Sequence, residues 1–78
     1  MEYTLYVTSI NPQTSLTSYN IVPQITLEES DSMISKMIKN NRVMELIVKD
    51  SKNNLVKAWN SLFGYTTSNK ELISWKHL

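Results

Sequence analysis

A single amphipathic helix, expected over residues 27–40, is the feature that most constrains how this chain can fold. It begins at Thr26-Leu27-Glu28-Glu29, where a hydroxyl at the N-cap and a carboxylate three residues later form a capping box. Asn40-Asn41 offers a left-handed end to the helix. Its apolar residues recur at helical spacing and predict one face that packs on a sheet, with the methionines acting as core filler. These residues are Met33, Ile34, Met37 and Ile38.

The segment before the helix predicts a long-looped hairpin. Residues 3–9 alternate between apolar and polar side chains with period two, which is typical of a half-buried strand. Asn11-Pro12 ends that strand, and a second alternation follows in which Tyr19 and Ile21 share the face of Ile25. Pro23 interrupts the second strand and cannot donate a ladder hydrogen bond, so this strand belongs at a sheet edge or carries a bulge.

The segment after the helix predicts a second hairpin. Residues 43–49 are apolar on both faces in their middle, as in a central strand, and residues 50–54 have the composition of a turn. Residues 55–60 then return as the partner strand, although residues 55–63 also fit a helix that ends at Gly64. The hairpin is favoured because its turn signal is specific. Residues 68–78 fit either a short capped helix or a final strand, and the strand is favoured.

The expected fold is therefore α+β, a single domain over residues 1–78 with the order ββαββ. One helix packs on an antiparallel sheet, and an extra C-terminal strand or short helix follows. A chain of this size buries only about 60–65% of its unfolded surface, so a homodimer through a sheet edge or an apolar face would add burial. Pro23 protects at least one edge against such pairing. Besides the helical stripe, the expected core consists of Tyr3, Leu5, Val7, Ile21, Ile25, Leu46, Val48 and Val56.

The chain has few residues of the types that serve in catalysis. We therefore expect that it is not an enzyme and that it has no cofactor and no metal site. It has one His, one Gly and no Cys, which removes zinc clusters and glycine-rich phosphate loops. His77 stands near the C-terminus, where a base is poorly positioned. The acidic group at Glu28, Glu29 and Asp31 is explained by the start of the helix.

We also expect no contact with a membrane. The longest apolar run is Leu46-Ile47-Val48, far below the roughly 20 residues of a membrane helix, and residues 1–4 do not resemble a signal peptide. The expected location is the cytoplasm.

Two surfaces remain as candidate binding sites. The net charge is +1, but residues 1–31 hold four acidic and no basic residues, whereas residues 32–78 hold all eight basic ones. Aromatic and cationic side chains on the sheet face opposite the helix suggest a protein interface, if the register of the second hairpin places Trp59 there. The protein-binding candidates are Tyr6, Ile47, Lys49, Lys57 and Trp59. A nucleic-acid alternative would use Lys36, Lys39, Arg42, Lys49, Lys52 and Lys57.

The layout of two hairpins around a helix that starts at Thr26-Leu27-Glu28-Glu29 resembles that of small phage and plasmid accessory proteins, including anti-CRISPR and other anti-defence inhibitors. The likeness covers about residues 2–60 and concerns layout alone, so no site residue carries over. It implies an inhibitor that blocks a host protein by stoichiometric surface binding in a bacterial cell, without a cofactor.

Three functions follow as hypotheses. The first is a non-enzymatic protein-binding module of this inhibitor type. The second is a small nucleic-acid-binding regulator that uses the basic stretch over residues 36–57. The third is a structural or assembly subunit, which would form a defined homo-oligomer alone.

Overall fold

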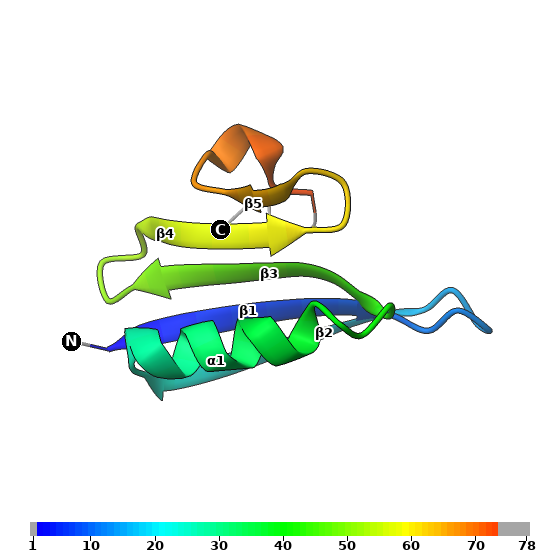
Figure 1. The fold of residues 1–78 in the computed structure, drawn as a ribbon, viewed down its shortest axis with the longest axis horizontal. Helices are drawn as coiled ribbons and strands as arrows, with labels where there is room; N and C mark the ends of the chain where they lie inside the picture. Colours follow the sequence, from blue (N-terminus) through cyan, green and yellow to red (C-terminus); the bar gives the residue numbers. More distant parts are fainter. Residues whose placement is uncertain (1, 74–78) are drawn as a thin grey trace.

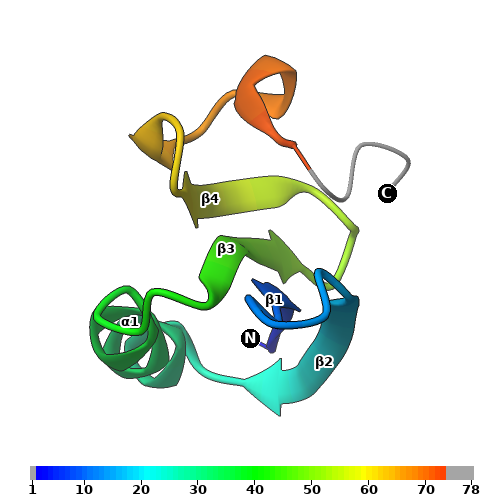
Figure 2. The same ribbon diagram turned by 90° about the vertical axis from the view of Figure 1, so that its right-hand side faces the viewer.

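The computed structural model describes residues 2–73 and confirms the predicted α+β fold (Figure 1). Within these residues, five antiparallel strands form one sheet in the order β2-β1-β3-β4-β5. The helix α1 packs on one face of that sheet, and Figure 2 shows it below β3 and beside β1 and β2. The elements are β1 (Tyr3–Ile10), β2 (Thr17–Ile25), α1 (Leu27–Met37), β3 (Val43–Asp50), β4 (Leu55–Asn60), β5 (Gly64–Thr66) and the short 3-10 helix η1 (Asn69–Glu71).

The start of α1 is the predicted capping box. The Glu29 backbone N–H donates to Thr26 Oγ1 at 3.0 Å, and the Thr26 backbone N–H donates to Glu29 Oε1 at 3.0 Å. The helix ends at Met37, earlier than predicted, with Ile38 as a right-handed C-cap. The expected left-handed end at Asn40-Asn41 is wrong, because Asn40 instead forms a turn in which its Oδ1 accepts from the Arg42 N–H.

Removing the cap gives a direct test of its contribution. We expect Thr26→Ala to lower the free energy of unfolding by about 1 kcal/mol, because the Glu29 backbone N–H loses its acceptor, Thr26 Oγ1, at the helix start. Urea denaturation measures the change. Thr67→Ala, at an exposed position outside the helix, should leave stability within about 0.5 kcal/mol of the parent. Equal losses in the two variants would show that the capping box contributes nothing.

The core on the helix face agrees with the prediction at every position but one. The apolar stripe of α1 packs against β1 and β3, where Leu5, Leu46 and Val48 are fully buried. Val56 also packs against this cluster, as predicted. The exception is Ile21, whose side chain is 55% exposed, while the neighbouring Val22 takes the expected place in the core.

A β-bulge in β2 explains the exchange of Ile21 for Val22. Ile25 lies opposite Tyr3, but Val22 lies opposite Leu5, so β2 contains one residue more than β1 over this interval. Gln24 has a φ of 58°, in the left-handed region. The extra residue reverses the alternation, which turns Ile21 and Tyr19 to the face away from α1. Pro23 thus stands both in an edge strand and at a bulge, as its position in the sequence predicted.

The second hairpin is confirmed, and the alternative helix over residues 55–63 is wrong. The turn between β3 and β4 is built on Asp50, whose Oδ1 accepts from the backbone N–H groups of Asn54 and Lys52 at 2.9 Å each. These hydrogen bonds, that of Asn54 first, hold the pKa of the Asp50 carboxyl below its usual 3.8. Asn53 takes a positive φ of 66°, which asparagine tolerates, so the local turn chemistry decides against the helix.

The C-terminal part contains a strand that the sequence did not predict and a short helix at the place where one of the two alternatives put it. The unpredicted strand is β5, which pairs with β4. The short helix is η1, where Ser68 Oγ accepts from the Lys70 N–H at 3.2 Å. The final strand expected from residue 72 onward does not form at residues 72–73, and its remainder lies outside the described residues. Among residues 2–73, no helix is long and apolar enough to span a bilayer.

Candidate functional site

The structure does not bring the five predicted protein-binding residues together. Tyr6, Ile47 and Lys49 lie on the face away from α1, whereas Trp59 and Lys57 lie on the helix face. The cause is a register shift between Val48 and Lys49, where Val48 lies opposite Lys57 but Lys49 lies opposite Leu55. The prediction of one shared aromatic and cationic face is therefore wrong.

Most of these five side chains are also withdrawn from solvent. Ile47 is fully buried in a cluster with Ala58 and Leu72, and Lys49 is only 4% exposed. Trp59 packs against the core beneath α1. Lys57 forms an ion pair with Asp31 of α1, a partly exposed pair of small energetic value.

The six basic residues of the nucleic-acid alternative do not form one strip. Lys36, Lys39 and Arg42 are exposed at the end of α1 and in the following turn. Lys52 is exposed in the turn at the opposite end of β3 (Figure 1). Because β3 has eight residues, its two ends lie on the order of 25 Å apart. The other two are the buried Lys49 and the ion-paired Lys57. A phosphate backbone would therefore meet separate basic groups instead of a continuous track.

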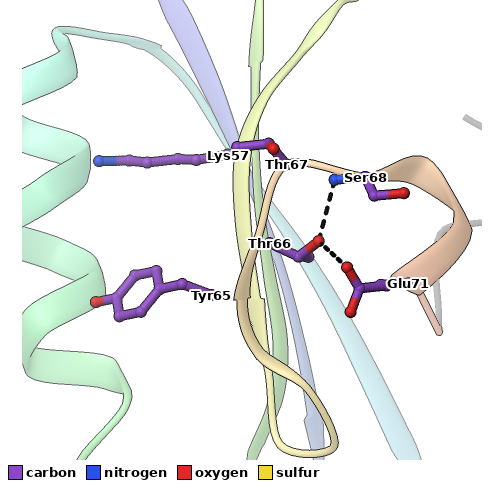
Figure 3. Close-up of a pocket in the computed structure, with 6 residues that line it drawn as sticks. All are labelled: Lys57, Tyr65, Thr66, Thr67, Ser68 and Glu71. Atoms are coloured by element: carbon purple, nitrogen blue, oxygen red, sulfur yellow. Dashed lines mark hydrogen bonds between the residues drawn. The ribbon is translucent and has the colours of Figure 1, made fainter.

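A shallow pocket of about 390 Å³ lies beside β5, and its groups do not converge (Figure 3). The Lys57 and Tyr65 side chains point toward α1, whereas Ser68 and Glu71 lie on the other side of the strand. The Glu71 carboxylate accepts from Thr66 Oγ1 at 2.7 Å, which fixes η1 against β5. Within residues 2–73 no group of three acidic or histidine side chains is arranged to hold a metal ion, and His77 lies outside them.

The most distinctive exposed feature is the turn between β4 and β5 together with the start of β5. Leu62, Phe63 and Tyr65, which we call the apolar turn, are 70%, 55% and 61% exposed. Single exposed apolar residues are ordinary. Three large ones within four positions are the most closely spaced exposed apolar side chains among residues 2–73. Gly64, at a φ of 75°, permits the reversal of the chain that places them at the molecular surface.

Buried polar groups hold the apolar turn in place. Asn60 is fully buried, and its Oδ1 accepts from the backbone N–H groups of Leu62 at 3.1 Å and Phe63 at 2.8 Å. Its Nδ2 donates to the Glu71 carbonyl at 2.9 Å and to Glu45 Oε2 at 3.3 Å. Glu45 Oε2 also accepts from the Ile73 N–H at 2.8 Å. The turn backbone is thus tied to the centre of the sheet while its apolar side chains face solvent.

Comparisons with models of protein families, with curated proteins and with solved structures found no match to this chain.

Sequence reasoning missed the apolar turn, although a signal for it was present. Asn60 and Gly64, the chain's single glycine, bracket Ser61-Leu62-Phe63, which is the pattern of a turn with an initiating asparagine and a left-handed glycine. The same residues also fit the spacing of a helix, in which Leu62 and Phe63 would belong to an apolar face.

Proposed function

We propose that this protein is a non-enzymatic protein-binding module that acts through the apolar turn. The observation that carries the proposal is the exposure of Leu62 and Phe63 on a backbone held by the buried Asn60. Exposing large apolar side chains to water costs free energy and adds nothing to the core. A partner protein that covers these side chains would recover that free energy on binding.

The rigidity of the turn supports binding as much as its apolar character. Ordering a loop and its side chains on association consumes part of the binding free energy. Here two hydrogen bonds from Leu62 and Phe63 to Asn60 fix the loop backbone before a partner arrives. Leucine and phenylalanine in a fixed position suit insertion into an apolar pocket of another protein.

The finer proposal is that the partner is a protein of a bacterial host and that the module is an inhibitor of the anti-CRISPR or anti-defence kind. The layout of the chain supports this, since it resembles such inhibitors in its two hairpins and single capped helix. Such an inhibitor would block its target by occupying a surface in a fixed stoichiometry and would need no chemistry of its own.

Affinity capture from bacterial lysate at near-physiological salt, after nuclease treatment, identifies the partner by mass spectrometry. Calorimetry with the purified partner then measures affinity and stoichiometry. We expect Leu62→Ser and Phe63→Ser each to weaken binding by about tenfold or more, because each removes an apolar anchor.

Leu16→Ser is the matched control, because Leu16 is 68% exposed, nearly as much as Leu62, but lies in the loop before β2. It should leave the affinity unchanged. Circular dichroism checks that all variants keep the fold. A partner that binds the Leu62 and Phe63 variants as tightly as the parent would contradict the proposed site.

A further inference from the structure

The strand β2 is an open edge of unusual length for so small a sheet. It spans nine residues and, among the strands of residues 2–73, has a neighbour on one side only. The strand at the other end of the order, β5, spans three residues. Exposed large apolar side chains also gather on β2 and the loop before it, namely Leu16, Tyr19 and Ile21. Among residues 2–73, the others are Leu27 and the three of the apolar turn. Long exposed edges are templates for pairing with another strand.

The hydrogen bonds around the first hairpin show which peptide groups face outward. The Asn11 N–H donates to the Leu16 carbonyl across the hairpin, whereas the Ile10 N–H donates to the Arg42 carbonyl, away from β2. In an antiparallel pair this alternation continues along the strand. The peptide groups of Thr17 and Ile21 therefore point away from β1, toward the open side of the sheet. Pro23, two residues beyond Ile21, has no N–H, so it protects only the C-terminal end of this edge and not the whole edge that the sequence expected it to protect.

Charge distinguishes this edge from protected ones. Proteins commonly block edge pairing with lysine or other charged side chains. Residues 3–27, which include all of β1 and β2, contain no charged residue. Two copies of β2 can therefore lie side by side without bringing like charges together.

We infer that β2 pairs antiparallel with β2 of a second copy of this chain, which joins the two sheets into one. A two-fold axis sets Thr17 of each copy opposite Ile21 of the other, so each Pro23 lies just beyond the paired segment. The same register sets Leu16 opposite Val22 of the second copy, so that the 68% exposed Leu16 and the 55% exposed Ile21 are covered by apolar or neutral neighbours. This pairing is independent of the apolar turn, which lies at the other end of the strand order.

Sedimentation equilibrium over a wide range of protein concentration tests the inference. We expect a mass twice that of the 9.0 kDa chain at high concentration, falling to that of one chain on dilution. Ile21→Lys adds a charge to the edge, and Thr17→Pro removes one outward N–H without disturbing the bonds to β1. Each should leave only the single-chain mass. Phe63→Lys is the matched control for Ile21→Lys, since both parent side chains are 55% exposed, and it should still form the dimer.

A single-chain mass for the parent at every concentration would overturn the inference, as would a dimer that survives both β2 variants. Binding of the protein partner separates this question from the proposed function. Ile21→Lys should still bind the partner with unchanged affinity per chain, whereas Phe63→Lys should not. A monomeric parent whose partner binding is lost in Ile21→Lys would show that a strand of another protein, not a second copy, occupies this edge.

Discussion

Replacing Asn60 by leucine is expected to lower the free energy of unfolding by about 3 kcal/mol or more and to loosen the apolar turn. The side chain is fully buried, and its amide meets four polar groups that would lose a partner: the N–H groups of Leu62 and Phe63, the Glu71 carbonyl and the Glu45 carboxylate. Each buried polar group left unsatisfied costs about 1–3 kcal/mol, and partial hydration of the loosened turn recovers some of that cost.

Urea denaturation measures the stability of the Asn60→Leu variant, and amide hydrogen exchange at Leu62 and Phe63 reports on the turn. Both amides should lose protection by a larger factor than amides of β1. Asn41→Leu, at an exposed position in the turn after α1, is the control and should change stability by less than about 0.5 kcal/mol. If the two variants are equally stable, the buried network does not hold the turn.

Leu46→Ala is expected to cost about 3 kcal/mol, because it opens a cavity at the centre of the core. Leu46 is fully buried in β3, between Val7 of β1 and Trp59 of β4. A chain of 78 residues has a total stability of about 4–12 kcal/mol, so this one substitution removes a large fraction of it. Thermal and urea denaturation should both show the loss.

Leu62→Ala deletes the same atoms from a side chain that is 70% exposed, which makes it the matched control for Leu46→Ala. It should leave stability within about 0.5 kcal/mol of the parent. Similar losses in the two variants would contradict the assigned core and would place Leu62 inside the fold.

Local chemistry made much of the fold predictable. The capping box at Thr26 and Glu29 and the turn after Asp50 rest on residues close in sequence, and both form as expected. The apolar stripe of α1 is also where its helical spacing placed it. Such features depend on few long-range details, so sequence alone identifies them well.

The sequence assigned side chains of β2 and β4 to the wrong faces of the sheet. The reason is a β-bulge in β2 and a register shift between β3 and β4. The bulge after Val22 turns Ile21 outward, and the shift opposite Lys49 sends Trp59 to the helix face. Because side chains alternate with period two, one extra residue reverses every assignment beyond it. Pro23 is consistent with a bulge in β2, but no residue type near Val48 and Lys49 indicates the register shift there.

The candidate site was missed for a related reason. Its support comes from Glu45 and Asn60, which lie 15 positions apart, and from the carbonyl of Glu71. Hydrophobic residues in a chain of this kind are assigned to the core by default. Only the paired strands β4 and β5 show that Leu62 and Phe63 are at a reversal of the chain and not along an element.

The strand order has a consequence for how the polypeptide acquires its shape during synthesis. Of the five described strands, β1 is synthesised before the others but lies between β2 and β3 in the sheet, and its pairing with β3 joins Tyr3 to Asp50. Pairing two strands so far apart in sequence is slow, and β1 cannot pair fully with β3 until Asp50 has left the ribosome. Until then the nascent chain carries one isolated hairpin and an uncovered helical stripe, so a chaperone is expected to engage it at that stage.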